Sequence, residues 1–162
     1  MSNSPETPVP AISPDPALKL LDRFVGSWTM EGNLIGSTEK NILGTTSYRW
    51  LPGGFFLEQR VQFDFAGWVE IDSTEIIGYD PATRTFPSLV YANMSPQPLP
   101  YVWQVDGDEV TITVTYGPMD ATFKGSFSAD GNRFHGAWRP NPGADEAVNI
   151  AYEIGGERVG AA

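Results

Sequence analysis

The chain has 162 residues, enough for one domain with a substantial core. Its 20 acidic and 10 basic residues give a formal net charge of −10, which argues against nucleic acid and an anionic membrane surface as partners. The absence of cysteine excludes disulfides, thiolate metal sites and a cysteine nucleophile, and the single histidine argues against the common zinc sites.

The first residues predict a tail. The segment MSNSPETPVPAISPDP lacks the basic start and apolar stretch of a secretory signal. No apolar run in the chain approaches the roughly 20 residues that cross a bilayer. Proline is frequent at this end and large apolar side chains are few, so we expect a flexible tail over residues 1–12 and one domain over residues 13–162. A cytoplasmic protein is the default expectation.

A single helix is predicted at the start of the domain. Ser13 can cap it, Pro14 suits its first turn, and Asp15 favours the positive end of the helix dipole. The apolar residues that follow at helical spacing are Leu18, Leu21, Phe24 and Val25. Gly26 then lets the chain turn sharply from the helix into a strand.

From Gly26 almost to the C-terminus the pattern has a period of two, which indicates strands. In EVTITVTY the inward face is predicted to carry Val110, Ile112, Val114 and Tyr116. The same alternation occurs in FFLEQRVQFDF, ATFKGSFS, RFHGAW and AVNIAYEI, the last with Val148, Ile150, Tyr152 and Ile154 on one face. Turn residues such as Asp106-Gly107 and Asp130-Gly131 separate these runs at short intervals. We expect about ten mostly antiparallel strands, forming a closed barrel or a sandwich.

Three segments resemble a known family. They are LKLLDRFVGSWTMEGN, YRWLPGGFFLEQR and STEIIGYDPATRTF, and they resemble a bacterial calycin-like family of uncharacterised function. The helix followed by Gly-x-Trp, here Gly26 and Trp28, is similar to the pattern shared by lipocalins. The resemblance implies an all-β, antiparallel up-and-down barrel whose cavity holds a small apolar molecule. It also implies a late arginine across the Trp28 ring, for which Arg139 and Arg158 are candidates.

Trp28 is expected to point inward and close one end of the barrel beneath the helix, or to act simply as a core anchor. The residues expected to bind a ligand in the cavity are Trp28, Met30, Tyr48, Trp50, Glu58, Arg60, Glu75, Tyr79, Trp103, His135 and Trp138. Glu58 and Arg60 share one face of FFLEQR and form either a surface pair or a ligand-orienting pair in the cavity. The same two interpretations apply to Glu75 and Tyr79 in STEIIGYD.

His135 has two interpretations. It lies opposite Phe134 and Trp138 in RFHGAWR, so it is either a surface histidine flanked by arginines or a haem ligand, as in the nitrobindins among haem-binding calycin barrels. Apart from this minor haem alternative, no cofactor and no metal is expected. The proline-rich loop from Ala92 to Pro100 is either a flap at the cavity mouth or a plain connector.

Three functions remain open at this stage. The first is binding of a small apolar or amphipathic molecule in the cavity, by a monomer or homodimer. The second is a cofactor-independent isomerase, cyclase or lyase, for which a carboxylate inside the cavity would be the distinguishing feature. The third is a filled barrel that contacts another protein through its exterior, with FDFAGWV, from Phe63 to Val69, as the contact patch.

Overall fold

A computed structural model of the chain describes residues 12–160. The flexible tail predicted for residues 1–12 lies, apart from Ile12, outside the described residues.

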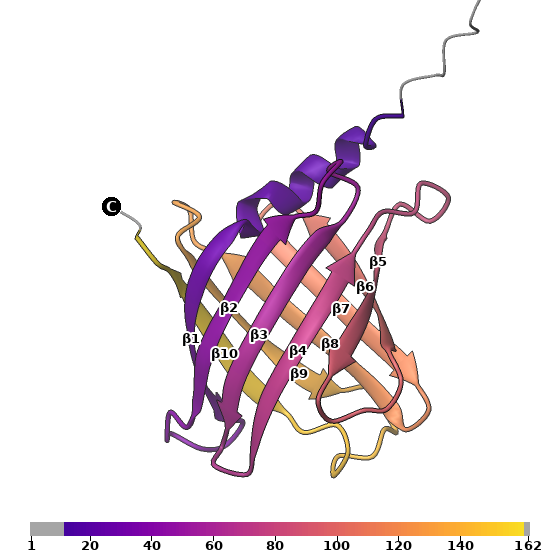
Figure 1. The fold of residues 1–162 in the computed structure, drawn as a ribbon. Helices are drawn as coiled ribbons and strands as arrows, with labels where there is room; N and C mark the ends of the chain where they lie inside the picture. Colours follow the sequence, from indigo (N-terminus) through magenta and orange to yellow (C-terminus); the bar gives the residue numbers. More distant parts are fainter. Residues whose placement is uncertain (1–11, 161–162) are drawn as a thin grey trace, which may run out of the picture.

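Ten antiparallel strands form a closed barrel, in which each strand pairs with its neighbours in the sequence and β1 pairs with β10 to complete the circle (Figure 1). The strands are β1 (Gly26–Leu34), β2 (Ile42–Trp50), β3 (Leu57–Phe65), β4 (Val69–Ile77), β5 (Phe86–Ala92), β6 (Leu99–Asp106), β7 (Glu109–Tyr116), β8 (Met119–Phe127), β9 (Arg133–Pro140) and β10 (Tyr152–Arg158). The prediction of an up-and-down barrel of about ten strands with one short N-terminal helix is confirmed.

The two faces of each strand differ as the period of two predicts. In β7 the inward residues Val110, Ile112 and Val114 are buried, and the threonines between them lie on the outside. Tyr116, which was expected on the inward face, is 41% exposed, because it ends the strand and its hydroxyl reaches Gln97 in the β5–β6 loop at 2.9 Å. The alternation therefore separates an apolar interior from a polar exterior over most of each strand.

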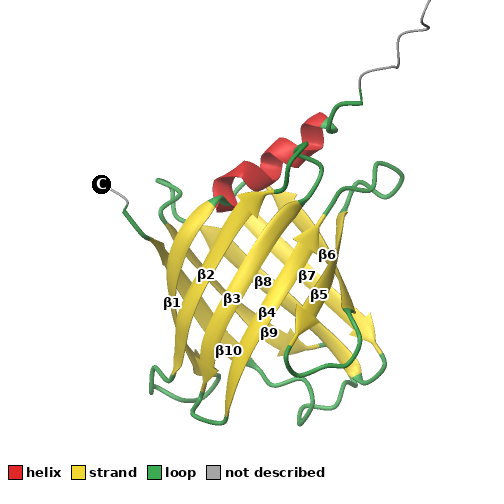
Figure 2. Cartoon of the chain, viewed as in Figure 1, coloured by secondary structure: helices red, strands yellow, loops and turns green. Residues whose placement is uncertain are grey.

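The helix η1 (Pro16–Phe24) lies across one end of the barrel (Figure 2). It is a 3₁₀-helix capped by Asp15, whose carboxylate accepts a hydrogen bond from the Ala17 amide at 2.9 Å, and Pro16 occupies its first turn. The predicted start at Ser13 and Pro14 was therefore too early, because Asp15 takes the capping role. The buried residues of the helix are Leu18, Leu21 and Phe24, which face the barrel.

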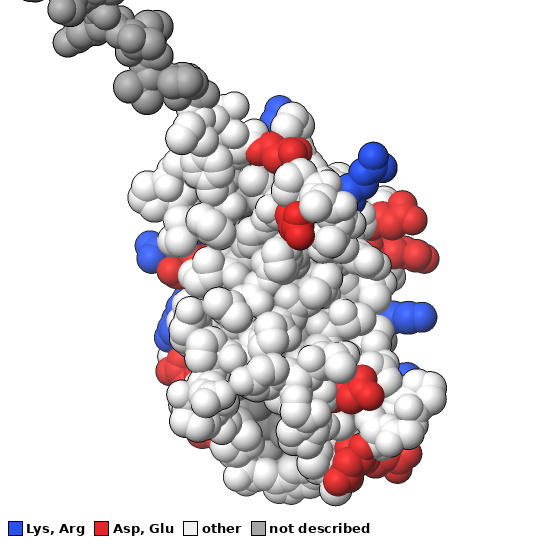
Figure 3. All heavy atoms as spheres, turned by 90° about the vertical axis from the view of Figure 1, so that its right-hand side faces the viewer, with Lys and Arg blue, Asp and Glu red and all other residues white. Residues whose placement is uncertain are grey.

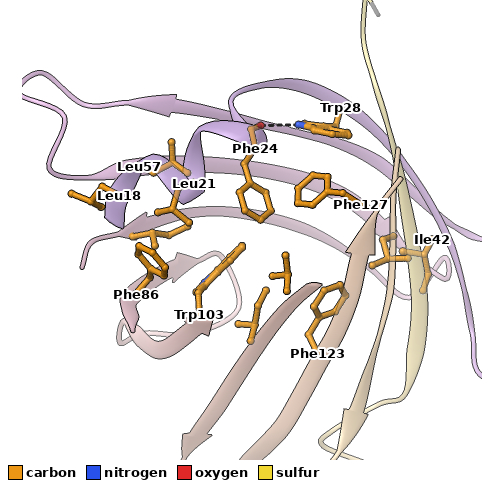
Figure 4. Close-up of a cluster of buried hydrophobic side chains, with 14 of the residues drawn as sticks. Leu18, Leu21, Phe24, Trp28, Ile42, Leu57, Phe86, Trp103, Phe123 and Phe127 are labelled. Atoms are coloured by element: carbon orange, nitrogen blue, oxygen red, sulfur yellow. Dashed lines mark hydrogen bonds between the residues drawn. The ribbon is translucent and has the colours of Figure 1, made fainter. Parts of the chain in front are cut away.

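Trp28 closes this end of the barrel, as predicted. Its ring is 3% exposed, and its indole N–H donates to the Phe24 carbonyl at 2.9 Å (Figure 4). The Arg158 guanidinium lies 4.3 Å from the ring centroid and donates to the carbonyl oxygens of Val25 and Arg23. Arg158 thus occupies the place that the resemblance gave to a late arginine, whereas Arg139 is exposed on β9.

Gly26 is required where the helix meets β1. Its φ of +123° lies in the region that side chains disfavour, and a Cβ there would lie 3.0 Å from the Arg158 guanidinium. The chain can therefore turn from the helix into β1 and leave room for Arg158 only with glycine at this position.

The strand predicted in AVNIAYEI is shorter than expected. β10 begins at Tyr152, and Val148 is 47% exposed in the preceding loop. The reason is the buried Asn149, whose side-chain amide donates to the carbonyls of Pro118 and Asp145 and whose oxygen accepts from the Asp120 amide. These bonds hold the segment as a compact loop against β8.

The outer surface over β5 and β6 carries few charges. The outward residues of β5 are Pro87, Leu89 and Tyr91, and Figure 3 shows acidic and basic side chains gathered mainly around the edges of this face. Trp68, in the segment expected to be a contact patch, lies in the β3–β4 turn and is 62% exposed.

Candidate functional site in the barrel interior

The barrel interior is densely packed at the helix end. Buried side chains of η1 meet the strand ends there, and this packed cluster includes Leu18, Leu21, Phe24, Leu57, Ile77, Phe86, Trp103 and Phe127 (Figure 4). Phe24 lies at its centre, with ring centroids of Trp103 and Phe127 at 5.5 and 4.9 Å. The helix end is therefore a structural core.

The interior is less completely packed in the distal half, the half remote from η1. Its inward side chains that are only half-buried are Phe63, Ile71, Val90, Leu99, Tyr101, Trp138 and Tyr152. Tyr101 and Trp138 meet edge to face with centroids 5.8 Å apart, and Tyr152 meets Phe65 in the same way at 5.0 Å. An aromatic wall with remaining accessible surface is suited to a small apolar guest.

Glu75 lies between the packed helix end and the distal half. It faces inward on β4 because it shares the inward face with Ser73 and Ile77, and its residue is 7% exposed. Its Oε2 atom accepts two hydrogen bonds of 2.6 Å, from the Ser88 hydroxyl on β5 and from the Trp103 indole N–H on β6. Three neighbouring strands thus fix the orientation of this carboxyl group.

The second carboxylate oxygen of Glu75 is free. Within residues 12–160 no hydrogen bond reaches Oε1. In the same range, the buried side-chain nitrogen and oxygen atoms that lack a partner and are sealed from water are Arg23 Nε and Asn41 Oδ1. Because Oε1 is not one of them, it faces space that a water molecule can enter, and so do the unpartnered hydroxyls of Tyr101 and Tyr152.

Within the described residues, no basic group pairs with Glu75. In the described strands, the inward positions hold no lysine, and the one inward arginine, Arg158, is engaged at Trp28. Burial raises the pKa of Glu75 to about 7, although the hydrogen bonds from Ser88 and Trp103 act to lower it. The group therefore changes between its neutral and charged forms near neutral pH.

Tyr48 and Tyr101 lie close enough to Glu75 to interact with its charge, and Tyr152 lies near Tyr101. Tyr48 and Gln59 are cross-strand neighbours on β2 and β3, Gln59 is opposite Glu75 on β4, and the Gln59 amide donates to the Tyr48 hydroxyl at 2.7 Å. Burial and the nearby charge of Glu75 raise the pKa of Tyr48, and the same two causes raise the pKa of Tyr101 to about 12. Burial also raises the pKa of Tyr152. All three hydroxyls stay protonated at neutral pH and can donate hydrogen bonds.

The structure divides the sequence-predicted residues into two groups. Those that face the barrel interior or its closed end are Trp28, Met30, Tyr48, Trp50, Glu75, Tyr79, Trp103 and Trp138. Within this group, Trp50 lies beneath the helix and donates to the Asp22 carboxylate at 2.8 Å, and Tyr79 packs on Phe86 at 5.2 Å. The Trp103 indole N–H donates a hydrogen bond to Glu75, and the charge of Glu75 helps to raise the pKa of Tyr48.

Glu58 and Arg60 lie on the outer face. The buried positions of β3 are Leu57, Val61 and Phe65, so the alternate residues must face out. Glu58 pairs with Arg49 at 3.0 Å, and Arg60 pairs with Asp72 at 2.9 Å. This placement corrects the prediction that Glu58 and Arg60 bind a ligand in the cavity.

His135 is also on the outside. It is exposed on β9, in a shallow surface hollow that also includes Glu31 and Glu157. The hollow forms because Gly155, directly between Glu31 and His135 in the sheet, has no side chain. A histidine in this place cannot ligate a haem held inside the barrel, so the haem alternative loses its ligand.

Several inward polar residues were not among the predicted site residues, and four of them bear on the distal half or on Glu75. They are Gln59, Ser88, Tyr101 and Tyr152. In FPSLVYA, Ser88 lies two residues from the inward Phe86 and two from the inward Val90. Because alternate residues of a strand share a face, the sequence already indicated that the Ser88 hydroxyl faces the interior. Tyr101 likewise shares the face of Trp103. The alternation could not reveal that Ser88 donates a hydrogen bond to Glu75, that Gln59 is opposite it on the neighbouring strand, or that Tyr101 lies near its charge.

Two wider features of the described chain bear on chemistry. Across residues 12–160 no three His, Asp or Glu side chains are grouped so that they could hold a metal ion. None of the helical structure in that range has the length and apolar character needed to cross a membrane.

Comparison with known proteins identifies the fold and the family. The crystal structure of Rv2717c from M. tuberculosis superposes with a TM-score of 0.57 at 15% identity, covering 90% of this chain and 99% of that one, which shows a common fold. A search of curated proteins found no match. The profile of the family described as "Protein of unknown function (DUF1579)" matches residues 13–126, well over half of the sequence. The chain therefore belongs to the DUF1579 family.

Proposed function

We propose that the barrel binds a small amphipathic molecule in the distal half of its interior, with Glu75 holding the polar end of that molecule. The observation that carries this proposal is the inward carboxylate with one oxygen bound and one oxygen free. A carboxyl group buried without a cation destabilises a fold. A partner supplied by a ligand would remove that cost, because Oε1 accepts a hydrogen bond from a group entering the interior.

The surroundings of Glu75 support an apolar body for the ligand. Tyr101, Trp138 and Tyr152 offer half-buried aromatic surface in the distal half, so a guest there would exchange water for ring contacts. Aromatic walls with a few convergent polar groups are the usual composition of a small-molecule site.

A matched pair of substitutions on β5 tests the location. Val90 faces inward, and Val90→Trp would fill part of the distal half, whereas Leu89, its neighbour, is 42% exposed and Leu89→Trp would leave the interior unchanged. We expect the wild type and Leu89→Trp to bind the neutral fluorescent probe N-phenyl-1-naphthylamine equally well, and Val90→Trp to bind it at least tenfold more weakly. Equal binding by both variants would place the probe on the outer surface and contradict the proposal.

A second candidate function is supported by the same carboxylate. An acid–base group works best when its pKa lies near the working pH, and the pKa of Glu75 is raised to about 7 inside a site that also holds protonated tyrosines. This arrangement suits a cofactor-independent isomerase, cyclase or lyase in which Glu75 removes a proton from carbon and Tyr101 stabilises the resulting oxyanion by donating a hydrogen bond.

Deuterium incorporation distinguishes catalysis from binding. An enolisable ketone that displaces the probe would be incubated with the protein in D₂O and followed by proton NMR. The enzyme hypothesis predicts exchange that Glu75→Gln abolishes while probe displacement continues, whereas a pure binding protein gives no exchange above the buffer rate.

A further inference from the structure

We propose that the polar end held by Glu75 is a protonated amine, so that the ligand is an organic cation with an apolar body and long-chain carboxylates are excluded. This inference rests on the proposed function and specifies the class of ligand that the site accepts. It is carried by the charge of the interior, the aromatic surfaces near Glu75 and the orientation of the free oxygen.

In the described barrel interior, the charged side chain that a ligand can still pair with is the negatively charged Glu75. Among the inward positions of the ten strands, the charged residues are Glu75 and Arg158, and the guanidinium of Arg158 is already committed to the Trp28 ring and two backbone carbonyls. A guest carboxylate would therefore lie near Glu75 without a cation, and two carboxylates in one buried site repel each other. An ammonium group supplies the charge that the site lacks.

The aromatic rings of the barrel interior favour the same ligand. Tyr101 and Trp138 form an edge-to-face pair, and Trp103 is bonded to the carboxylate itself. Aromatic faces attract cations through the ring quadrupole, and the attraction strengthens where water is excluded. A carboxylate combined with several rings is thus a suitable environment for an ammonium group, whereas a hydroxyl would gain a hydrogen bond and no charge pairing.

The free oxygen is held ready for a donor. The hydrogen bonds from Ser88 and Trp103 both go to Oε2, so the carboxyl group cannot turn without breaking them. Oε1 consequently keeps its direction toward water-accessible space, and a ligand N–H can bond to it with little reorganisation. The net charge of −10 adds a long-range attraction for cations at low salt.

A matched series of ten-carbon compounds tests the charge preference. Decylamine, decanol and decanoate share one apolar chain and differ in the end group, and each would be titrated into the wild type preloaded with N-phenyl-1-naphthylamine. The titrations would be run below the micellar range, in about 0.3 M salt, where attraction to exposed acidic side chains is largely screened. We expect decylamine to displace the probe at a concentration at least tenfold lower than decanol, and decanoate to be the weakest.

Two variants locate the preference. Glu75→Gln removes the inward charge and keeps a hydrogen-bond acceptor, whereas Glu58→Gln removes one negative charge from the outer face. Glu75→Gln is expected to weaken decylamine binding until it is within about threefold of decanol binding to the same variant, and Glu58→Gln is expected to keep the tenfold preference. Unfolding midpoints of both variants would verify that each is folded.

The outcomes separate the two proposals. If decanol or decanoate binds as tightly as decylamine, the amine inference is overturned and the binding function stands. If decylamine keeps its advantage in Glu75→Gln, the cation binds elsewhere and the inference is again overturned. If none of the three compounds displaces the probe from the interior, the binding function itself is contradicted.

Discussion

Replacing Glu75 with glutamine should change how the stability of the protein depends on pH. The pKa of this group is raised from its ordinary value of 4.5 to about 7 in the folded protein, chiefly because burial disfavours the charged form. The folded state therefore holds the proton more tightly than the unfolded state does. Relative to a permanently charged group, the stability contributed by the proton is fully present below pH 4.5 and is lost as the pH rises through about 7.

The size of this effect follows from the two pKa values. Each tenfold difference in proton affinity is worth about 1.4 kcal/mol, so the step from 4.5 to about 7 corresponds to about 3 kcal/mol. Because the Glu75 residue is only 7% exposed, solvent screening reduces this figure little. Between pH 5 and pH 8 the wild type should therefore lose about 2.5 kcal/mol of this stability, which Glu75→Gln does not lose.

Urea denaturation of both proteins at intervals from pH 5 to pH 8 measures this difference. The comparison cancels contributions from the other titrating groups, and Glu58→Gln serves as a control because its side chain pairs with Arg49 on the outer face. We expect Glu75→Gln to gain stability relative to the wild type as the pH rises, and Glu58→Gln to show no such trend. A constant difference between wild type and Glu75→Gln across this range would refute the claim that the carboxyl group is buried without a counter-charge.

Three further substitutions test other parts of the structure. Arg158→Met should reduce the free energy of unfolding by about 2 kcal/mol because two backbone carbonyls and the Trp28 ring lose their donor, while Arg139→Met on the exposed face should change it by less than about 0.5 kcal/mol, both measured in urea. Gly136→Ala should lower the free energy of unfolding by about 1–3 kcal/mol, because the added Cβ would lie 2.6 Å from the Lys124 carbonyl oxygen and against the Phe123 ring. Gly155→Ala should be tolerated, because the nearest contact of its Cβ is at 3.4 Å. Equal thermal unfolding midpoints of the two variants would contradict this packing. Trp103→Phe removes a bond that lowers the pKa of Glu75, so the pH at which stability declines should rise, and an unchanged midpoint of that decline would argue against the bond.

The strands were predictable from the sequence because their signal is regular, whereas their closure into a barrel rather than a sandwich was implied by the family resemblance. Alternation over eight or nine residues, interrupted by turn residues, determines which face of most strands is buried. In β3 the predicted apolar face with Leu57, Val61 and Phe65 is the buried one, and this settles that Glu58, for which both faces had been considered, lies outside. The helix-to-strand turn at Gly26 and the inward indole at Trp28 were also readable, since each depends on local geometry and on one large ring.

The interior site was harder to predict because β4 has apolar residues on both faces. In VEIDSTEII, Ile76 and Ile77 are adjacent and necessarily point in opposite directions, so parity alone cannot decide whether Glu75 faces in or out. The decision depends on the register with β3 and β5, where Gln59 and Val90 are opposite Glu75. The bonds to Ser88 and Trp103 join residues 13 and 28 positions away and carry no local sequence signal.

The pH titration of the Glu75 side chain itself tests the central claim most directly. In protein labelled with ¹³C at the glutamate carboxyl carbon, the Glu75 resonance is the one missing from the spectrum of Glu75→Gln. We predict that this resonance titrates near pH 7 in the free protein and at a lower pH once decylamine is bound, because an ammonium partner favours the carboxylate. A resonance that titrates near 4.5 and does not respond to decylamine would contradict a buried carboxylate that holds the polar end of a ligand.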